Sequence, residues 1–201
     1  MYKVYQKIIL ACLLLVMTGT VYSQRVTQTI NDGWKFSLFE GDASTADFDI
    51  SGWTDVSIPH TWNAKDADDE IPGYFRGKGW YRKVVTVEEL IPEQRVYLSF
   101  EGANQETNVF VNGTFVGNHK GGYSAFTFDV TDYVHAGRNL IAVSVDNSHH
   151  PDIAPLSADF TFFGGIYRDV YLVYTSPVQL STTHYASSGV VLKASKFTDL
   201  Q

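Results

Sequence analysis

The chain has 201 residues, of which 44% are hydrophobic and 14% aromatic, and this is enough apolar material to bury the core of one domain. Its formal net charge of −7 argues against nucleic-acid binding, because an acidic surface repels phosphate groups. Cys12 is its only cysteine, which excludes a disulfide within the chain and a cysteine-based metal site.

The first residues have the pattern of a secretory signal peptide. Two lysines precede an apolar run over residues 8–17, and Val21 and Ser23 follow at the small-residue positions of a cleavage site. The alternative, a transmembrane anchor, needs about 20 apolar residues. We therefore expect a signal peptide over residues 1–23, export to the periplasm or the cell exterior, and no membrane contact after cleavage.

The rest of the chain alternates apolar and polar residues with a period of two, which is typical of half-buried strands. In residues 33–38, for example, Trp34, Phe36 and Leu38 would share one face. The predicted strands are 33–38, 80–87, 95–100, 107–111, 114–117, 125–130, 139–145 and 166–174. No long segment keeps a helical period.

Turn signals separate these strands. They are Asn31-Asp32-Gly33, Asn112-Gly113, Gly121-Gly122 and Ala136-Gly137. Asn112-Gly113 is the sharpest of them, because a type I′ turn needs positive φ at both central residues. Many short strands without intervening helices predict an all-β fold, and we expect an antiparallel jelly-roll β-sandwich.

Two longer stretches, residues 55–78 and 147–164, do not fit the strand pattern. Long irregular segments in a β-domain are often functional loops. Both are rich in rings and carboxylates, which suits carbohydrate, since sugar C–H faces stack on rings while acids and amides bind hydroxyls. Alternatively, the loop aromatics plug the ends of the sandwich. These aromatics are Trp62, Tyr74, Phe160, Phe162 and Phe163.

Several segments occur in the order and spacing of one known family. They are NDGWKFSL, IPHTWN, GWYRK, LSFEGANQETNVFVNGTFVGNHKGGYSAFTFDVTDYV, NLIAVSVDNS and DFTFFGGIYRDVYL. Over about residues 28–180 the chain resembles the N-terminal sugar-binding domain of glycoside hydrolase family 2, the family of β-galactosidases and β-glucuronidases. The resemblance implies a galactose-binding-like jelly roll that packs against a catalytic (β/α)8 barrel.

The resemblance also implies a division of the chain. Residues 24–180 would form the sugar-binding domain and residues 181–201 a stub of an immunoglobulin-like domain, as in a shortened form of a longer enzyme. The barrel would supply both glutamates of a retaining mechanism. None of the chain's own glutamates lies in a setting that resembles the catalytic motifs of the family. We expect no catalytic residue, cofactor or metal here, and no hydrolysis by this chain alone.

Asp159 is the main candidate for a contact with substrate, a terminal β-linked sugar. It stands six residues before Gly165, the spacing of an acid that accepts hydrogen bonds from sugar hydroxyls in the β-galactosidase branch. One carboxylate can accept from two hydroxyls at once. Alternatively, Asp159 caps a turn where the last strand begins. Asn63 and Tyr74, in the first long loop, could border the same sugar.

Three other charged or polar residues are expected to serve the fold. Arg168 and Glu101 lie in the family pattern, and we expect a partly buried ion pair between them across the sandwich, because charges inside a fold are usually paired. His60 is expected to fix its loop through a hydrogen bond.

Two further motifs are weak. His149, His150 and Asp152 lie close together in the sequence. Adjacent histidines rarely coordinate one metal ion without further ligands from distant parts of the chain, so no metal site is expected. The triplet Asn112-Gly113-Thr114 matches a glycosylation sequon, yet the turn already explains Asn and Gly there.

Three functions remain open from the sequence. The first is a sugar-binding, non-catalytic domain of a secreted β-galactosidase-like enzyme, supplying a carboxylate to the barrel. The second is a free-standing carbohydrate-binding module, and the third is a purely structural sandwich.

Overall fold

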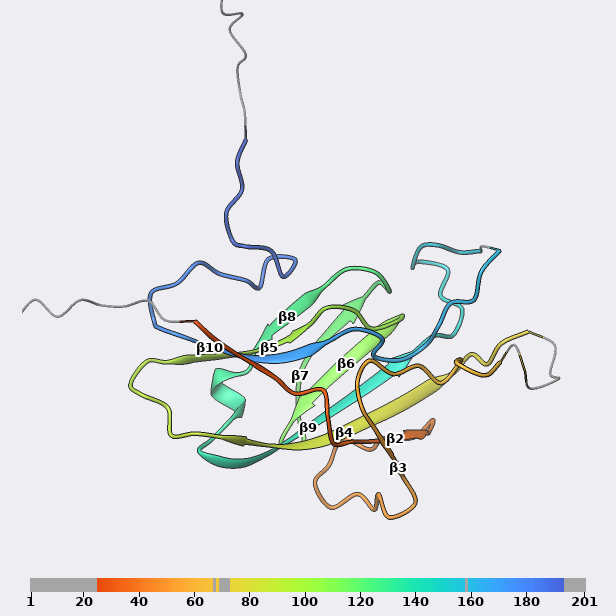
Figure 1. Cartoon of the computed structure of the whole chain (residues 1–201), viewed down its shortest axis with the longest axis horizontal. Coiled ribbons are helices and arrows are strands. Elements are labelled where there is room, and N and C mark those ends of the chain that lie inside the picture. Colours follow the sequence, from red (N-terminus) through yellow and green to blue (C-terminus); the bar gives the residue numbers. More distant parts are fainter. Residues whose placement is uncertain (1–24, 67, 69–72, 158, 194–201) are drawn as a thin grey trace, which may run out of the picture.

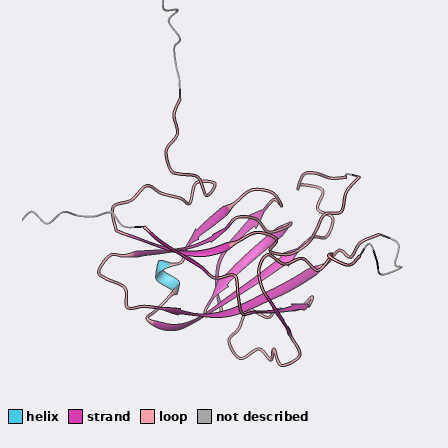
Figure 2. Ribbon diagram, in the orientation of Figure 1, coloured by secondary structure: helices cyan, strands magenta, loops and turns pink. Residues whose placement is uncertain are grey.

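The computed structural model describes residues 25–66, 68, 73–157 and 159–193 (Figure 1). The predicted signal peptide and the last eight residues of the predicted stub lie outside this part. The described chain forms two antiparallel sheets and one short 3-10 helix, η1 (Thr131–Tyr133) (Figure 2). No helix in the described ranges is long and apolar enough to cross a membrane.

The first sheet has four strands in the order β1-β10-β5-β8. These are β1 (Val26–Thr29), β10 (Val170–Thr175), β5 (Arg95–Phe100) and β8 (Phe126–Asp129). The second sheet has six strands in the order β3-β2-β4-β9-β6-β7. These are β3 (Thr54–Val56), β2 (Trp34–Leu38), β4 (Lys78–Val87), β9 (Gly137–Asp146), β6 (Glu106–Val111) and β7 (Thr114–Lys120). The antiparallel sandwich predicted from the sequence is confirmed.

The core lies between the two sheets, because alternate residues of each strand point the same way. Val96, Leu98 and Phe100 of β5 are completely buried, and they belong to one apolar cluster with Trp34 and Tyr81 of the opposite sheet. Burial of so many large side chains is the main source of stability for such a fold.

All eight predicted strands are present, although their limits differ. β10 begins at Val170 instead of residue 166. In the segment before it, Gly165 forms an isolated bridge with Asn104, and the carbonyl oxygen of Ile166 accepts from the backbone N–H of His60. The sequence pattern missed β1 and β3. All four residues of β1 are exposed, and β3 has only three residues, so neither shows a buried alternation.

The Asn112-Gly113 turn is confirmed, with φ of 51° and 81° at its two central residues. The Asn112 side chain also holds the neighbouring chain. Its Nδ2 donates to the carbonyl oxygen of Tyr133 and to Oδ1 of Asn139, both at 2.9 Å, and its Oδ1 accepts from the backbone of Leu140. Its side chain thus serves the turn and its surroundings.

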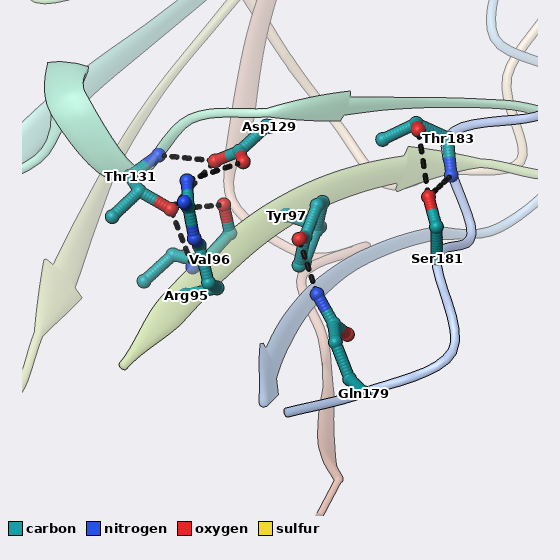
Figure 3. A network of polar contacts seen from close by, with 8 residues as sticks. All are labelled: Arg95, Val96, Tyr97, Asp129, Thr131, Gln179, Ser181 and Thr183. Atoms are coloured by element: carbon teal, nitrogen blue, oxygen red, sulfur yellow. Dashed lines mark hydrogen bonds and ion pairs between the residues drawn. The ribbon is translucent and has the colours of Figure 1, made fainter. Parts of the chain in front are cut away.

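The segment after β10 returns along the four-stranded sheet. Gln179 donates to the Tyr97 hydroxyl, and the hydroxyls of Ser181 and Thr183 lie 2.9 Å apart (Figure 3). Residues 181–193 contain no strand. Whether they belong to a following domain stays a prediction.

Candidate functional site

The two long loops predicted from the sequence meet at one end of the sandwich (Figure 1). Asn147 follows β9, and its Nδ2 donates to Oδ1 of Asn63 at 3.2 Å and to the carbonyl oxygen of Phe162 at 3.1 Å. Its Oδ1 accepts from the backbone N–H of Gly77 at 2.8 Å. Asn147 therefore joins the first loop to the second.

Asn63 completes this junction from the other side. Its Nδ2 donates to the carbonyl oxygen of Phe75 at 2.8 Å and to Asp66 at 2.7 Å, while its Oδ1 accepts from the backbone of Gly164 at 2.6 Å. Asn63 is 3% exposed and Asn147 is 1% exposed. Asn63 thus lies beneath the loops and holds them. Its predicted direct contact with a sugar stays a prediction.

Sequence reasoning did not single out Asn147. The available signal was its position, since a polar side chain directly after a long buried strand must find partners inside the fold. The sequence shows that Asn147 lies in the segment NLIAVSVDNS, but it does not show the hydrogen-bond partners of Asn147, which lie 15 to 84 positions away.

The two glycines after the Asp159 loop allow close packing. Gly165 has φ of +117°, and a methyl group added to it would lie 2.6 Å from both the His60 carbonyl oxygen and the Tyr81 hydroxyl. A methyl group on Gly164 would lie 2.1 Å from the Trp62 ring. A larger residue at either position would push the loop away from the sandwich.

Asp159 is exposed on the loop that these residues anchor. Within the described ranges, its carboxylate takes part in no hydrogen bond or ion pair. A turn-capping aspartate would accept a backbone N–H of its own loop, as Asp129 does from Thr131 at 3.0 Å. Asp159 is thus open to a ligand, and its role in sugar binding stays a prediction.

Tyr74 lies close to the base of the Asp159 loop. Its ring meets Phe162 edge-on with centroids 6.4 Å apart, and the Arg76 guanidinium lies 4.9 Å from the Tyr74 centroid and 5.1 Å from that of Phe162. Arg76 also donates to the Tyr74 hydroxyl. The structure thus brings Tyr74 together with the second loop, and its predicted contact with a sugar stays a prediction.

The loop aromatics divide into two groups. Trp62 stacks on Phe36 of the core with centroids 5.8 Å apart, and Phe162 is buried, so these two rings do plug the sandwich. Phe160 and Phe163 are instead 53% and 47% exposed. They line a pocket of about 190 Å³.

His60 fixes its loop, as predicted. Its Nδ1 lies 2.8 Å from the Tyr81 hydroxyl, and its backbone N–H donates to the carbonyl oxygen of Ile166 at 2.7 Å. Burial lowers the pKa of His60 and raises that of Tyr81. Both side chains are therefore neutral near pH 7.

The predicted ion pair between Arg168 and Glu101 is wrong. Both residues are exposed, and neither takes part in an ion pair in the described part of the chain. The Arg168 guanidinium lies 5.4 Å from the Tyr167 ring centroid, and Glu101 accepts from the Tyr171 hydroxyl at 3.2 Å. Because Arg168 precedes β10, its charge stays hydrated and avoids the cost of burial.

The histidine-rich segment binds the neighbouring strands. His150 lies 3.5 Å from Glu106 of β6, and Asp152 pairs with Lys120 of β7 at 3.2 Å. No group of three or more potential metal ligands occurs among the residues with described coordinates. The two side chains thus tie the second loop to the edge of the six-stranded sheet.

Comparison with known proteins agrees with this geometry. Residues 27–177 match the family model described as the sugar-binding domain of glycosyl hydrolases family 2. A putative β-glucuronidase of Formosa agariphila is 37% identical over 174 residues, which cover 84% of this chain and 21% of that protein. A β-glucuronidase of Bacteroides fragilis is 38% identical over 183 residues, covering 89% of this chain and 25% of that protein.

A solved structure gives the same result. The β-glucuronidase of Bacteroides uniformis is 44% identical with a TM-score of 0.76, and the match covers 82% of this chain and 20% of that one. This chain spans about a fifth to a quarter of the length of these relatives. The chain belongs to glycoside hydrolase family 2, and its sandwich is the sugar-binding domain of that family.

Proposed function

We propose that this chain is the non-catalytic, sugar-binding part of an exported family 2 glycoside hydrolase, and that Asp159 is a carboxylate it supplies to the active site of a catalytic barrel. The substrate would be a terminal β-glucuronide or β-galactoside, the two classes for which the relatives are named. The observation that carries the proposal is an exposed Asp159 on a loop with a firmly bonded base.

The chemistry of a carboxylate fits this role. Asp159 can accept hydrogen bonds from two adjacent sugar hydroxyls, and each charge-assisted bond contributes about 1.5–3 kcal/mol. Because Asn63 and Asn147 fix the loop base, little further ordering is needed on binding, so more of this energy remains for affinity. The domain would orient the sugar, while the acid and the nucleophile come from the barrel.

A free-standing carbohydrate-binding module is the second candidate. It is favoured by the exposed rings of Phe160 and Phe163, which give this chain a pocket of its own. Such a module would bind a simple sugar without a barrel. The third possibility, a purely structural sandwich, leaves Asp159 without a role.

The proposal can be tested in a chimera. Residues 25–180 would replace the equivalent domain of the Bacteroides uniformis β-glucuronidase, and kcat/KM would be measured for aryl β-glucuronides and β-galactosides. Asp159→Asn should lower kcat/KM about 10- to 100-fold, as expected for one lost charge-assisted bond. Asp152→Asn is the matched control, since Asp152 is an exposed acid of the same loop, paired with Lys120.

An active chimera in which both variants have the same kcat/KM would contradict the role of Asp159. The 201-residue chain alone should turn over no aryl glycoside. If that chain binds a simple sugar and Asp159→Asn weakens the binding, the free-standing module becomes the better description.

A further inference from the structure

The two sheets are not joined by hydrogen bonds between β7 and β8. β7 is the last strand of the six-stranded sheet and β8 is the last strand of the four-stranded sheet. In the described ranges no backbone hydrogen bond links these two strands. The Phe128 ring of β8 instead packs on Gly117 of β7, where an added methyl group would lie 2.4 Å from the ring. This region, the β7–β8 seam, leaves backbone groups of two edge strands available.

A hollow of about 410 Å³ lies in the β7–β8 seam. It is lined by residues 118–120 of β7, by residues 124–128 at and before β8, and by residues 183–185 of the segment after β10. Its volume falls within the range of about 300–1,000 Å³ that is typical of small-molecule sites. None of these residues belongs to either long loop, and none lines the pocket of Phe160 and Phe163. The hollow is therefore a separate place on the domain.

Rings line the hollow from both of its segments. His119 of β7 stacks on the buried ring of Phe126, with centroids 4.1 Å apart and planes at 13°. Burial lowers the pKa of His119, so its ring is neutral near pH 7. On the segment after β10, Tyr185 lines the hollow and is 81% exposed, and the His184 ring meets it edge-on with centroids 4.6 Å apart. Such rings suit the C–H face of a sugar.

The hollow also has polar groups that can bond hydroxyls. Ser124 Oγ lies 3.4 Å from His119 Nε2, which is longer than an ordinary hydrogen bond, so both atoms can still bond a ligand. Asn118 donates through Nδ2, while its Oδ1 accepts no hydrogen bond from the described residues. Lys120 is the one lining residue with a permanent charge, and it is paired with Asp152 at 3.2 Å. Rings and hydroxyl-binding groups without a free charge favour a neutral sugar over an acidic one.

We propose that the β7–β8 seam is a second carbohydrate site, which binds one pyranose unit of a neutral glycan. The C–H face of the sugar lies on the rings of His119 and Tyr185, and Asn118 and Ser124 bond its hydroxyls. Binding removes the exposed ring of Tyr185 from water, which is favourable. The site goes beyond the contact proposed for Asp159 and does not depend on it. On a polymer that reaches both places, the seam raises affinity by holding a second unit of the same chain.

A ¹⁵N NMR titration of the 201-residue chain tests the site directly. The probes are lactose, which is neutral, and methyl β-D-glucuronide, which is charged. Lactose should shift the backbone amides of residues 118–128 and 183–185 along a saturable curve, and the glucuronide should bind there with lower affinity. No shift at lactose concentrations up to about 50 mM, well above the millimolar Kd expected for one sugar unit, would overturn the proposal. Equal or tighter binding of the glucuronide would overturn the assignment to a neutral sugar.

Variants and the pattern of shifts identify the place of binding. Tyr185→Ala and Ser124→Ala should each weaken lactose binding about fivefold, as expected for one lost ring contact or hydrogen bond. Phe115→Ala is the control, because Phe115 is an exposed ring on β7 outside the hollow. Circular dichroism would verify that each variant is folded. Unchanged binding in both folded seam variants would refute the assignment. Shifts confined to residues 159–163 would place lactose at the second long loop, so this inference would fail while the proposed function stands.

Discussion

The side-chain amide of Asn147 donates to Oδ1 of Asn63 at 3.2 Å and so joins two loops that are 84 residues apart in sequence. Both side chains are buried, and each also bonds the backbone of the opposite loop. The position of Asp159 relative to the sheets therefore depends on two carboxamides that never reach the surface.

Asn147→Ala should lower the free energy of unfolding by about 3 kcal/mol, because it leaves several buried groups without partners. Urea unfolding monitored by tryptophan fluorescence measures this change. Asn118→Ala is the control. The Nδ2 of Asn118 likewise has three acceptors within hydrogen-bond distance, the nearest being Oδ1 of Asn108 at 2.9 Å. Because Asn118 is exposed on β7, its loss should cost less than about 1 kcal/mol. An equal loss of unfolding free energy in Asn147→Ala and Asn118→Ala would contradict the role of Asn147 in holding the two loops together.

Gly165→Ala should destabilise the domain by about 2–4 kcal/mol, since the new methyl group meets two oxygen atoms at 2.6 Å and φ is +117°. Thermal unfolding followed by circular dichroism gives the change. Gly52→Ala serves as the reference, because no atom lies within 4 Å of its added methyl group. It should alter stability by less than about 0.5 kcal/mol. A tolerated Gly165→Ala would mean that the loop can move away from Tyr81.

Two partly buried histidines should make stability depend on pH below neutrality. Burial lowers the pKa of His60 and His119 from the usual 6.5, so the unfolded chain takes up protons first as the pH falls. The free energy of unfolding should be constant above about pH 7.5 and decrease below pH 6.5, by at most about 1.4 kcal/mol per pH unit for each histidine. Urea titrations of His60→Gln and His119→Gln should each show a smaller decrease. A stability that rises between pH 7.5 and 5.5 would contradict this sign.

Asp159→Asn should leave the free energy of unfolding of this chain within about 0.5 kcal/mol of the wild type, because the carboxylate has no partner among the described residues. Asp129→Asn provides the comparison. Asp129 accepts from the Thr131 hydroxyl at 2.6 Å and pairs with Arg95 at 3.1 Å (Figure 3), so its change should cost about 1 kcal/mol. A cost at Asp159 as large as that at Asp129 would assign Asp159 to the fold as a turn cap.

Some structural roles could be predicted at single positions, and others could not. The turn at Asn112-Gly113 was predictable because Asn and Gly adopt positive φ at little cost wherever they occur. The Arg168 prediction failed because the sequence does not show where a strand begins. The predicted strand included residues 166–169, yet β10 starts at Val170 and Arg168 remains in water.

The sequence by itself determined the all-β class, the approximate strands and the two loops, because the alternation of side chains and the preferences of turn residues are local properties of the chain. The tertiary structure alone decided that Asn63 is buried beneath the loops, that Asn147 is its partner, and that Phe160 and Phe163 are exposed while Phe162 is buried. These features depend on contacts between residues up to 101 positions apart, and such contacts form only when the two sheets close over a common core.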